Sequence, residues 1–139
     1  MLDASVAIKW AMPSAREPFT DQSLRLLKRY VDGDVAFLVP DVFWAEVGKV
    51  LWKGTRQRRW SQDEAESVAE DMQARDFTTV PSLLLLSEAL RIAFAHDREV
   101  SDCLYVALAV QFKCDLITAD ERLADALAAR FPVKWLGTL

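Results

Sequence analysis

The 139-residue sequence lacks the features that would place it in a membrane or outside the cell. No apolar run approaches the roughly 20 residues that a membrane-spanning helix needs. The first residues have neither the basic segment nor the long apolar segment of a signal peptide. Its two cysteines, Cys103 and Cys114, fall in one expected helix, about 16 Å apart along its axis and beyond disulfide reach. We therefore expect a cytoplasmic protein with reduced thiols and no membrane contact.

Positive charge and histidine are also scarce. The formal net charge of -4 argues against a protein that holds nucleic acid by bulk electrostatics alone. It does not argue against a protein that binds the phosphates of nucleic acid through a metal ion. One histidine, and cysteines without zinc spacing, supply too few nitrogen and sulfur ligands for a zinc site. A metal held by this chain would therefore be bound by oxygen.

The length and the absence of linkers, repeats and low-complexity segments indicate a single domain over residues 1–139. Short apolar, β-favouring segments alternate with segments of helical period. The expected strands cover the residues before Asp3 and residues 35–39, 77–80, 116–118 and 133–136. The expected helices cover residues 4–10, 16–32, 41–53, 61–75, 83–95, 103–112 and 121–130, with Pro13 ending the first. Gly54 is the expected stop of the third helix, and Ser61 with Glu64 forms an expected capping box at the start of the fourth. This alternation predicts an α/β fold with a parallel sheet of about five strands and helices on both faces.

The stretch DLITADERL places an acid where a strand becomes a helix. Residues 116–118 form the expected strand, and Asp120 follows it directly before the helix. Asp3 occupies the same position at the start of the chain, although only two residues precede it. For either acid alone, the simpler interpretation is a helix N-cap. The repetition favours a site, because ligands bind at the carboxyl ends of strands in open parallel sheets.

Two further acids, Glu46 and Asp102, can reach the same edge of the sheet. Glu46 lies at the edge of the apolar stripe of its helix, and Asp102 lies at the start of an almost entirely apolar helix. Taken alone, Glu46 could be a surface residue paired with Lys49 or Lys53, and Asp102 could be favoured there by the helix dipole. Right-handed crossovers place all the carboxyl ends of the strands on one edge, so the acids can converge.

Four converging carboxylates require a cation. At 5 Å and an effective dielectric constant near 20, each pair of carboxylates repels by about 3 kcal/mol. A purely oxygen ligand set suits a hard ion such as Mg²⁺ or Mn²⁺. Such an ion activates water and neutralises charge on phosphoryl oxygens. The acids therefore predict hydrolysis of phosphodiester bonds.

One basic, aromatic-rich cluster lies in the middle of the chain and contains Lys53, Arg56, Arg58 and Arg59, flanked by Trp52 and Trp60. Such a cluster can hold nucleic acid by phosphate contact and base stacking. The ordinary interpretation of a charged run is a solvated surface. Elsewhere, four consecutive leucines at residues 83–86 exceed what one core face uses, which indicates a partner surface.

Four segments together resemble the PIN-domain ribonucleases, and most closely the VapC toxins of type II toxin-antitoxin systems. They are LDASVAIKW at residues 2–10, FWAEV at residues 43–47, SDCLYVALA at residues 101–109 and LITADERL at residues 116–123. Each motif is weak, but their order and spacing are specific and cover essentially the entire chain. The resemblance implies a three-layer α/β/α Rossmann-like PIN domain and a metal-dependent endoribonuclease.

The same resemblance assigns roles to individual residues and implies partners. The catalytic, metal-binding acids would be Asp3, Glu46, Asp102 and Asp120, with Mg²⁺ as the ion and Mn²⁺ as a substitute. Ser5 and Thr118 would supply hydroxyls that orient the ligands or a water molecule. The implied partners are an RNA substrate, an inhibitory antitoxin of the VapB type and a second copy of the chain. A homodimer would explain the surplus leucines.

Two other functions compete with the nuclease. A phosphatase or phosphoryl-acceptor domain also places acids over Mg²⁺, but it needs a second acid two residues after the nucleophilic Asp. Here Asp3 is followed by Ala4 and Ser5, which argues against that class. A catalytically silent PIN-like module that binds RNA or protein is the second alternative. The presence of all four acids argues against it, and a cleavage assay distinguishes the two.

Overall fold

The computed structural model describes residues 1–12 and 18–139. In these ranges the helices are α1 (Ala4–Ala11), α2 (Thr20–Val31), α3 (Val42–Arg56), α4 (Gln62–Gln73), α5 (Leu86–His96), α6 (Val100–Phe112) and α7 (Glu121–Leu127). The strands are β1 (Leu38–Pro40), β2 (Thr78–Val80), β3 (Leu116–Thr118) and β4 (Val133–Trp135), and the 3-10 helices are η2 (Ser82–Leu84) and η3 (Leu136–Thr138). The predicted helix end at Pro13 and helix start at Arg16 lie outside the described residues.

The strands form two parallel pairs. β1 pairs with β2, and β3 pairs with β4. Leu2 lies between the pairs: it forms a parallel bridge with Ile117 of β3, and its N–H donates to the carbonyl of Leu38 in β1 at 3.2 Å. The prediction of one sheet of about five strands is therefore wrong for the described residues, because the segment before Asp3 contributes a single bridge where a full strand was expected.

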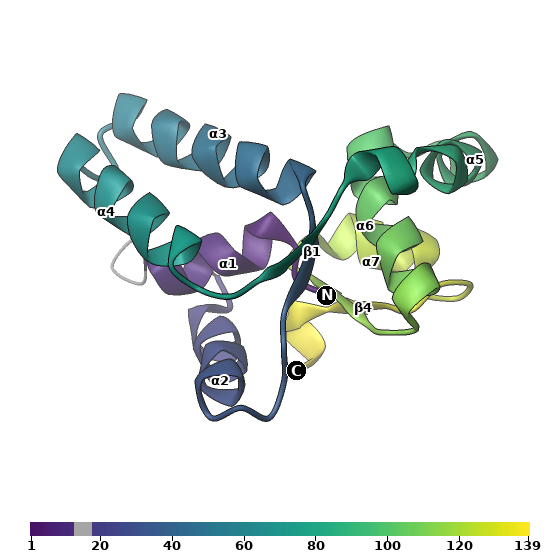
Figure 1. Ribbon diagram of the computed structural model, residues 1–139, viewed down its shortest axis with the longest axis horizontal. Helices are drawn as coiled ribbons and strands as arrows, with labels where there is room; N and C mark the ends of the chain where they lie inside the picture. Colours follow the sequence, from purple (N-terminus) through teal and green to yellow (C-terminus); the bar gives the residue numbers. More distant parts are fainter. Residues whose placement is uncertain (13–17) are drawn as a thin grey trace.

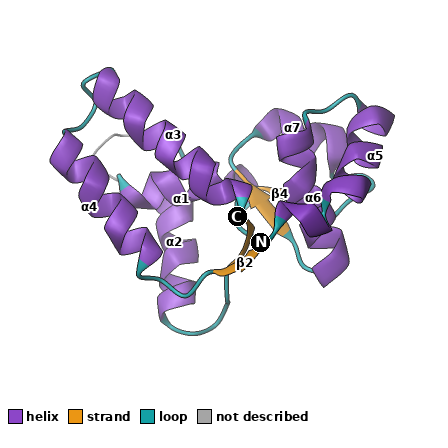
Figure 2. Ribbon diagram, turned by 45° about the horizontal axis from the view of Figure 1, so that its top comes forward, coloured by secondary structure: helices purple, strands orange, loops and turns teal. Residues whose placement is uncertain are grey.

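Helices lie on both sides of the strands. In Figure 1, α1 to α4 occupy the left part of the molecule and α5 to α7 the right part, with the strands between them. The second view keeps the same separation (Figure 2). The predicted α/β class is confirmed, and the strand ends lie where the two groups of helices meet.

The helix α6 is the most buried element in the described part of the chain. Its residues from Cys103 to Ala109 are all buried, as the apolar sequence of this helix predicts. It contacts α5, β1 and β3. Because α6 touches one strand of each pair, it connects the two pairs, and its N-terminal turn carries Asp102.

The helix α3 continues past Gly54, where the sequence predicts its end. The indole ring of Trp60 packs against the backbone of Gly54 and occupies the position that a Cβ atom would need. The indole N–H donates to the carbonyl of Leu51 at 3.0 Å. The prediction of a helix stop was therefore wrong: this glycine permits a close approach of an aromatic ring, and α3 extends to Arg56.

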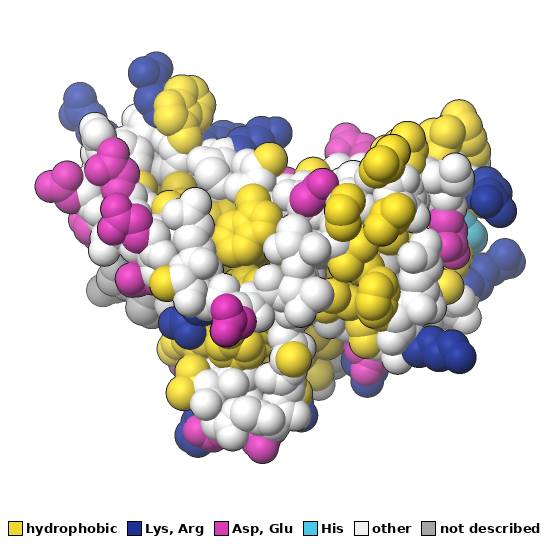
Figure 3. All heavy atoms as spheres, in the orientation of Figure 1, with side chains coloured by type: hydrophobic (Ala, Val, Ile, Leu, Met, Phe, Trp, Pro, Cys, Tyr) yellow, Lys and Arg dark blue, Asp and Glu magenta, His cyan; other side chains and the backbone are white. Residues whose placement is uncertain are grey.

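The helix expected over residues 83–95 is divided into η2 and α5, which begins at Leu86. Leu85 is fully buried, whereas its neighbours point outward. Figure 3 shows apolar side chains gathered over the part of the molecule where α5 lies. We define the leucine face as the exposed residues of η2 and α5, namely Leu83, Leu84, Leu86, Leu90 and Phe94.

One of the two cysteines lies in α6 and the other follows this helix. Cys103 is buried in α6, Cys114 is half-buried, and both are free. Within the described residues, no helix has the length and apolar character needed to cross a bilayer.

Candidate active site

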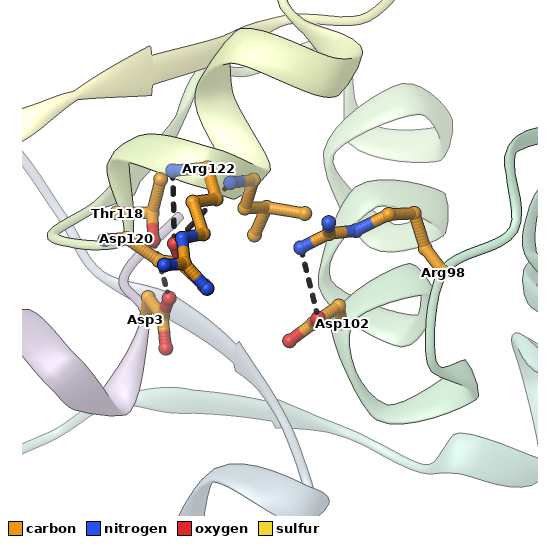
Figure 4. Close-up of polar contacts among 7 residues, drawn as sticks. Asp3, Arg98, Asp102, Thr118, Asp120 and Arg122 are labelled. Carbon is orange, nitrogen blue, oxygen red and sulfur yellow. Dashed lines mark hydrogen bonds and ion pairs between the residues drawn. The ribbon is translucent and has the colours of Figure 1, made fainter.

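Asp3 follows the bridging residue Leu2 and caps α1. Its Oδ1 accepts the N–H of Ser5 at 3.3 Å, and its Oδ2 accepts the hydroxyl of Thr118 at 2.7 Å (Figure 4). Burial raises the pKa of Asp3; the hydrogen bonds from Thr118 and Ser5 lower it, and the neighbouring charge of Asp120 raises it. Asp3 is thus a helix cap, as the simpler interpretation holds, and it also faces a second carboxylate.

Asp120 caps α7 in the same way. Its Oδ1 accepts the N–H groups of Arg122 at 3.0 Å and Leu123 at 3.3 Å. The N–H of Asp120 donates to the hydroxyl oxygen of Thr118 at 3.0 Å. Thr118 is fully buried, and its one hydroxyl joins the side chain of Asp3 to the backbone of Asp120. The two acids predicted at strand ends are therefore linked through this one hydroxyl.

Ser5 supports the same junction from α1. Its Oγ accepts the N–H of Ala119 at 3.2 Å, which holds the first turn of α1 against the turn between β3 and α7. Its hydroxyl also lowers the pKa of Asp3 by hydrogen bonding. Ser5 and Thr118, the two hydroxyl residues singled out in the sequence, both lie in contact with the acid pair.

Asp102 lies in the first turn of α6 and has a basic neighbour. The guanidinium Nη2 of Arg98 lies 3.7 Å from its Oδ2, and Figure 4 shows Arg98 reaching toward Asp102 from the loop before α6. Burial raises the pKa of Asp102, the charge of Asp3 raises it further, Arg98 lowers it and Asp120 raises it. Asp102 therefore lies within the electrostatic reach of both Asp3 and Asp120.

Glu46 completes the group from the second turn of α3. Burial raises its pKa, the Tyr105 hydroxyl lowers it, and the charges of Asp3 and Asp102 raise it. Its buried Oε1 has no hydrogen-bond partner among the described residues. Glu46 thus turns toward the other acids, and the surface ion pair considered for it in the sequence is not its main environment.

The four acids come from four separate elements: the start of α1, the interior of α3, the start of α6 and the start of α7. As they stand, no group of three or more Asp, Glu, His or Cys side chains in the described ranges encloses a point where a metal ion could be held. The carboxylates are nevertheless close enough for Asp3 to raise the pKa values of Glu46 and Asp102.

The donor set suits a hard divalent cation. All four candidate ligands are carboxylates, and the buried Oε1 of Glu46 lacks a partner within the described residues. Like charges that raise one another's pKa values are stabilised when a cation is bound among them. The one histidine, His96, instead packs edge to face against Phe131 at the end of α5. The residues present therefore fit an oxygen-bound ion, and a bound ion would have to draw their side chains together.

A cavity of about 300 Å³ opens beside the acids. Ser5 and Asp120 line it on the side of the site, and the rest of its wall consists of Ile8, Lys9, Val50 and Ala119. It lies between α1, α3 and the turn after β3. A substrate at the acids would have room to extend in this direction.

The basic cluster predicted in the sequence is not brought to the acids. Lys53 and Arg56 lie in the last turns of α3, and Arg58 and Arg59 follow the helix. At 1.5 Å per residue, Arg56 lies about 15 Å along the axis from Glu46. Arg56 stacks over the Trp52 ring at 5.4 Å and Arg59 over the Trp60 ring at 5.1 Å.

Two residues near the acids were missed in the sequence. Arg98 falls between two expected helices, and Tyr105 falls inside the almost entirely apolar helix at residues 103–112. The spacing of Tyr105, three residues after Asp102, places both side chains on one face of α6 and is the signal that could have identified it. Nothing local in the sequence indicates that this face meets Glu46 of α3.

Comparison with known proteins links the chain to a protein family and to a similar ribonuclease. The sequence model of the PIN domain family matches residues 1–128, a range that includes all four acids. The chain is also similar to Ribonuclease VapC3 of Pyrobaculum aerophilum, with 34% identity over 88 residues, which is 60% of this chain and 66% of that protein. Because the family match covers nearly the whole sequence and the acids lie within it, this chain belongs to the PIN domain family.

Proposed function

We propose that the chain is a Mg²⁺-dependent endoribonuclease toxin that hydrolyses RNA phosphodiester bonds at Asp3, Glu46, Asp102 and Asp120. The observation that carries the proposal is the convergence of these carboxylates from four elements. The pKa values of three of the carboxylates, Asp3, Glu46 and Asp102, are raised. The similarity to a protein named Ribonuclease VapC3 supports RNA as the substrate. Mn²⁺ would substitute for Mg²⁺, because both ions accept oxygen ligands.

In this mechanism the four carboxylates would hold the ion, and the residues behind them keep them in place. Thr118 donates to Asp3, and backbone N–H groups at the start of α7 fix Asp120. Arg98 offsets part of the charge on Asp102. When bound, a divalent ion lowers the pKa of an attacking water and neutralises charge developing on the phosphate.

The proposal extends to the surroundings of the enzyme. All 139 residues would form one PIN domain in the cytoplasm, inhibited by a cognate antitoxin of the VapB type. RNA would extend from the acids into the adjoining cavity beside Ser5 and Val50. The distant cluster of Lys53, Arg56, Arg58 and Arg59 stays a predicted RNA contact, reached only by a substrate longer than the site itself.

A homodimer would cover the leucine face. Leu86, Leu90 and Phe94 recur every fourth residue along α5 and are 50%, 40% and 81% exposed. An exposed apolar stripe of this kind is typical of a protein interface. We expect Leu90→Glu to convert a dimer into a monomer, measured by light scattering during gel filtration. Val31→Glu, at a 66% exposed position on α2, is the control that should leave the dimer intact. A monomeric wild type would contradict the proposal.

The nuclease is tested by incubating purified protein with cellular RNA in Mg²⁺, in Mn²⁺ and in chelator. We expect discrete fragments with either ion and none in chelator, because the carboxylates alone cannot activate water or balance the phosphate charge. Sequencing the fragment ends identifies the RNA and the cleaved bond. Cleavage that persists in chelator would contradict the assigned role of the acids.

The competing proposal is a PIN-like module that binds RNA or protein without turnover. One observation favours it: in the described ranges the acids do not enclose a metal position as they stand. Folded protein that binds RNA but yields no fragments under any ion would support this alternative.

A further inference from the structure

The four acids differ in how they are held. Asp3 accepts hydrogen bonds from Thr118 and Ser5, Asp120 accepts two backbone N–H groups, and Asp102 lies beside Arg98. Glu46 has the longest side chain of the four, and its Oε1 has no hydrogen-bond partner among the described residues. A carboxylate that ligates a metal is normally fixed by a neighbouring hydrogen-bond donor. Such a donor for Glu46 has to come from a residue not yet assigned.

Tyr105 provides a hydroxyl at this place. Its side chain is 2% exposed, and its hydroxyl is buried without a hydrogen-bond partner in the described part of the chain. Leaving a buried polar group unpaired costs about 1–3 kcal/mol. A phenylalanine would fill the same space in α6 without that cost, so packing alone does not account for the hydroxyl.

The Tyr105 hydroxyl lies close to Glu46 and within electrostatic reach of Asp3. Burial raises the pKa of Tyr105, and Asp3 and Glu46 raise it further, while the hydroxyl in turn lowers the pKa of Glu46. A phenolic hydroxyl acts as the donor toward a carboxylate, because an ionised carboxylate can only accept hydrogen bonds. The two unpartnered atoms, Glu46 Oε1 and the Tyr105 hydroxyl, can therefore satisfy each other.

We propose that Tyr105 is a positioning residue that donates its hydroxyl to Glu46 Oε1 and so holds the other carboxylate oxygen toward the metal. This inference rests on the proposed metal-dependent function and adds to it a residue that supports Glu46. Tyr105 does not touch the substrate. Its role is to restrict Glu46 to one arrangement, which lowers the entropy that the side chain loses when an ion binds.

The test is Tyr105→Phe, with Mn²⁺ affinity measured by calorimetry on purified protein in the absence of RNA. We expect the dissociation constant to rise about 10- to 100-fold, the usual effect of losing a group that supports a metal ligand. Tyr30→Phe is the matched control, because Tyr30 lies on α2 and stacks against Phe37 outside the site. It should leave the affinity unchanged.

A double mutant isolates the contact with Glu46. In a Glu46→Gln background, Tyr105→Phe should have no further effect on Mn²⁺ affinity, since the carboxylate it positions is already lost. If the hydroxyl had a purely structural role, Tyr105→Phe would lower the melting temperature in chelator and leave the Mn²⁺ affinity unchanged. That result would overturn the inference. Wild-type protein that binds no Mn²⁺ would contradict the proposed function itself, whereas equal affinities for wild type and Tyr105→Phe would contradict the role of Tyr105 alone.

Discussion

We expect Asp3→Asn to reduce RNA cleavage by more than about 100-fold. A loss of about 100-fold is the upper end of what removing a group that only supports a metal ligand causes. Asp3 is the acid that raises the pKa values of Glu46, Asp102 and Tyr105, so it lies nearest the electrostatic centre of the group. Asparagine caps helices as well as aspartate does, so α1 should keep its start. We therefore expect inactive protein whose melting temperature in chelator equals or exceeds that of wild type.

Asp3→Ala separates the two roles of this residue. Alanine removes the charge and also the acceptor for the N–H of Ser5 and the hydroxyl of Thr118. Loss of an N-cap costs about 1 kcal/mol, which lowers the melting temperature of a domain of this size by about 4 °C. Both variants should be inactive, and only the alanine variant should be less stable. Full cleavage by folded Asp3→Asn would show that the acid is a cap and nothing more.

Stabilisation by Mn²⁺ is expected to grow as the pH rises. The pKa values of Asp3, Glu46 and Asp102 are raised above the ordinary 3.8 for Asp and 4.5 for Glu. In the window between the ordinary and the raised values the folded chain binds more protons than the unfolded chain, so these groups reduce stability as the pH rises. A bound ion replaces the protons and removes this penalty.

Thermal melting with Mn²⁺ and with chelator, from about pH 4.5 to 8, measures this dependence. At a metal concentration 100 times the dissociation constant, the gain is about 2.7 kcal/mol, or about 10 °C in a domain of this size. Near the lower pH the gain should shrink, because protons compete for the carboxylates. Glu70→Gln, which removes an exposed acid of α4, should leave the dependence intact, and Asp3→Asn should abolish it. If the stabilisation by Mn²⁺ did not depend on pH, the ion would have to bind away from these acids.

The parts of the site that consist of helix caps could be predicted from the sequence. Asp3 and Asp120 were identified because an acid between a strand and a helix satisfies free N–H groups of the helix, and both residues do so. The capping box predicted at Ser61 and Glu64 is present for the same reason, with reciprocal hydrogen bonds of 3.1 and 3.3 Å. These features depend on neighbours within one helical turn, which a sequence displays directly.

The features that the sequence did not reveal depend on contacts between distant elements. Gly54 was expected to end α3 because glycine is a poor helix residue, but the packing of Trp60 reverses that preference. The single bridge of Leu2 depends on the separation of the two strand pairs, which no local pattern encodes. Tyr105 was assigned to an apolar helix face because only the packing of α6 near α3 shows what its hydroxyl meets.

The bridge between Leu2 and Ile117 also sets the order in which the molecule can be completed. The ribosome makes Asp3 well before the hydroxyl of Thr118 that holds it, which lies 115 residues later in the chain. Contacts of such separation close late in folding. Asp3 therefore lacks this partner until the segment of β3 has been made. A chain that ends before β3 would contain Asp3 and Glu46 but neither Thr118 nor Asp120, so the four acids can come together only after β3 and the start of α7 have been made.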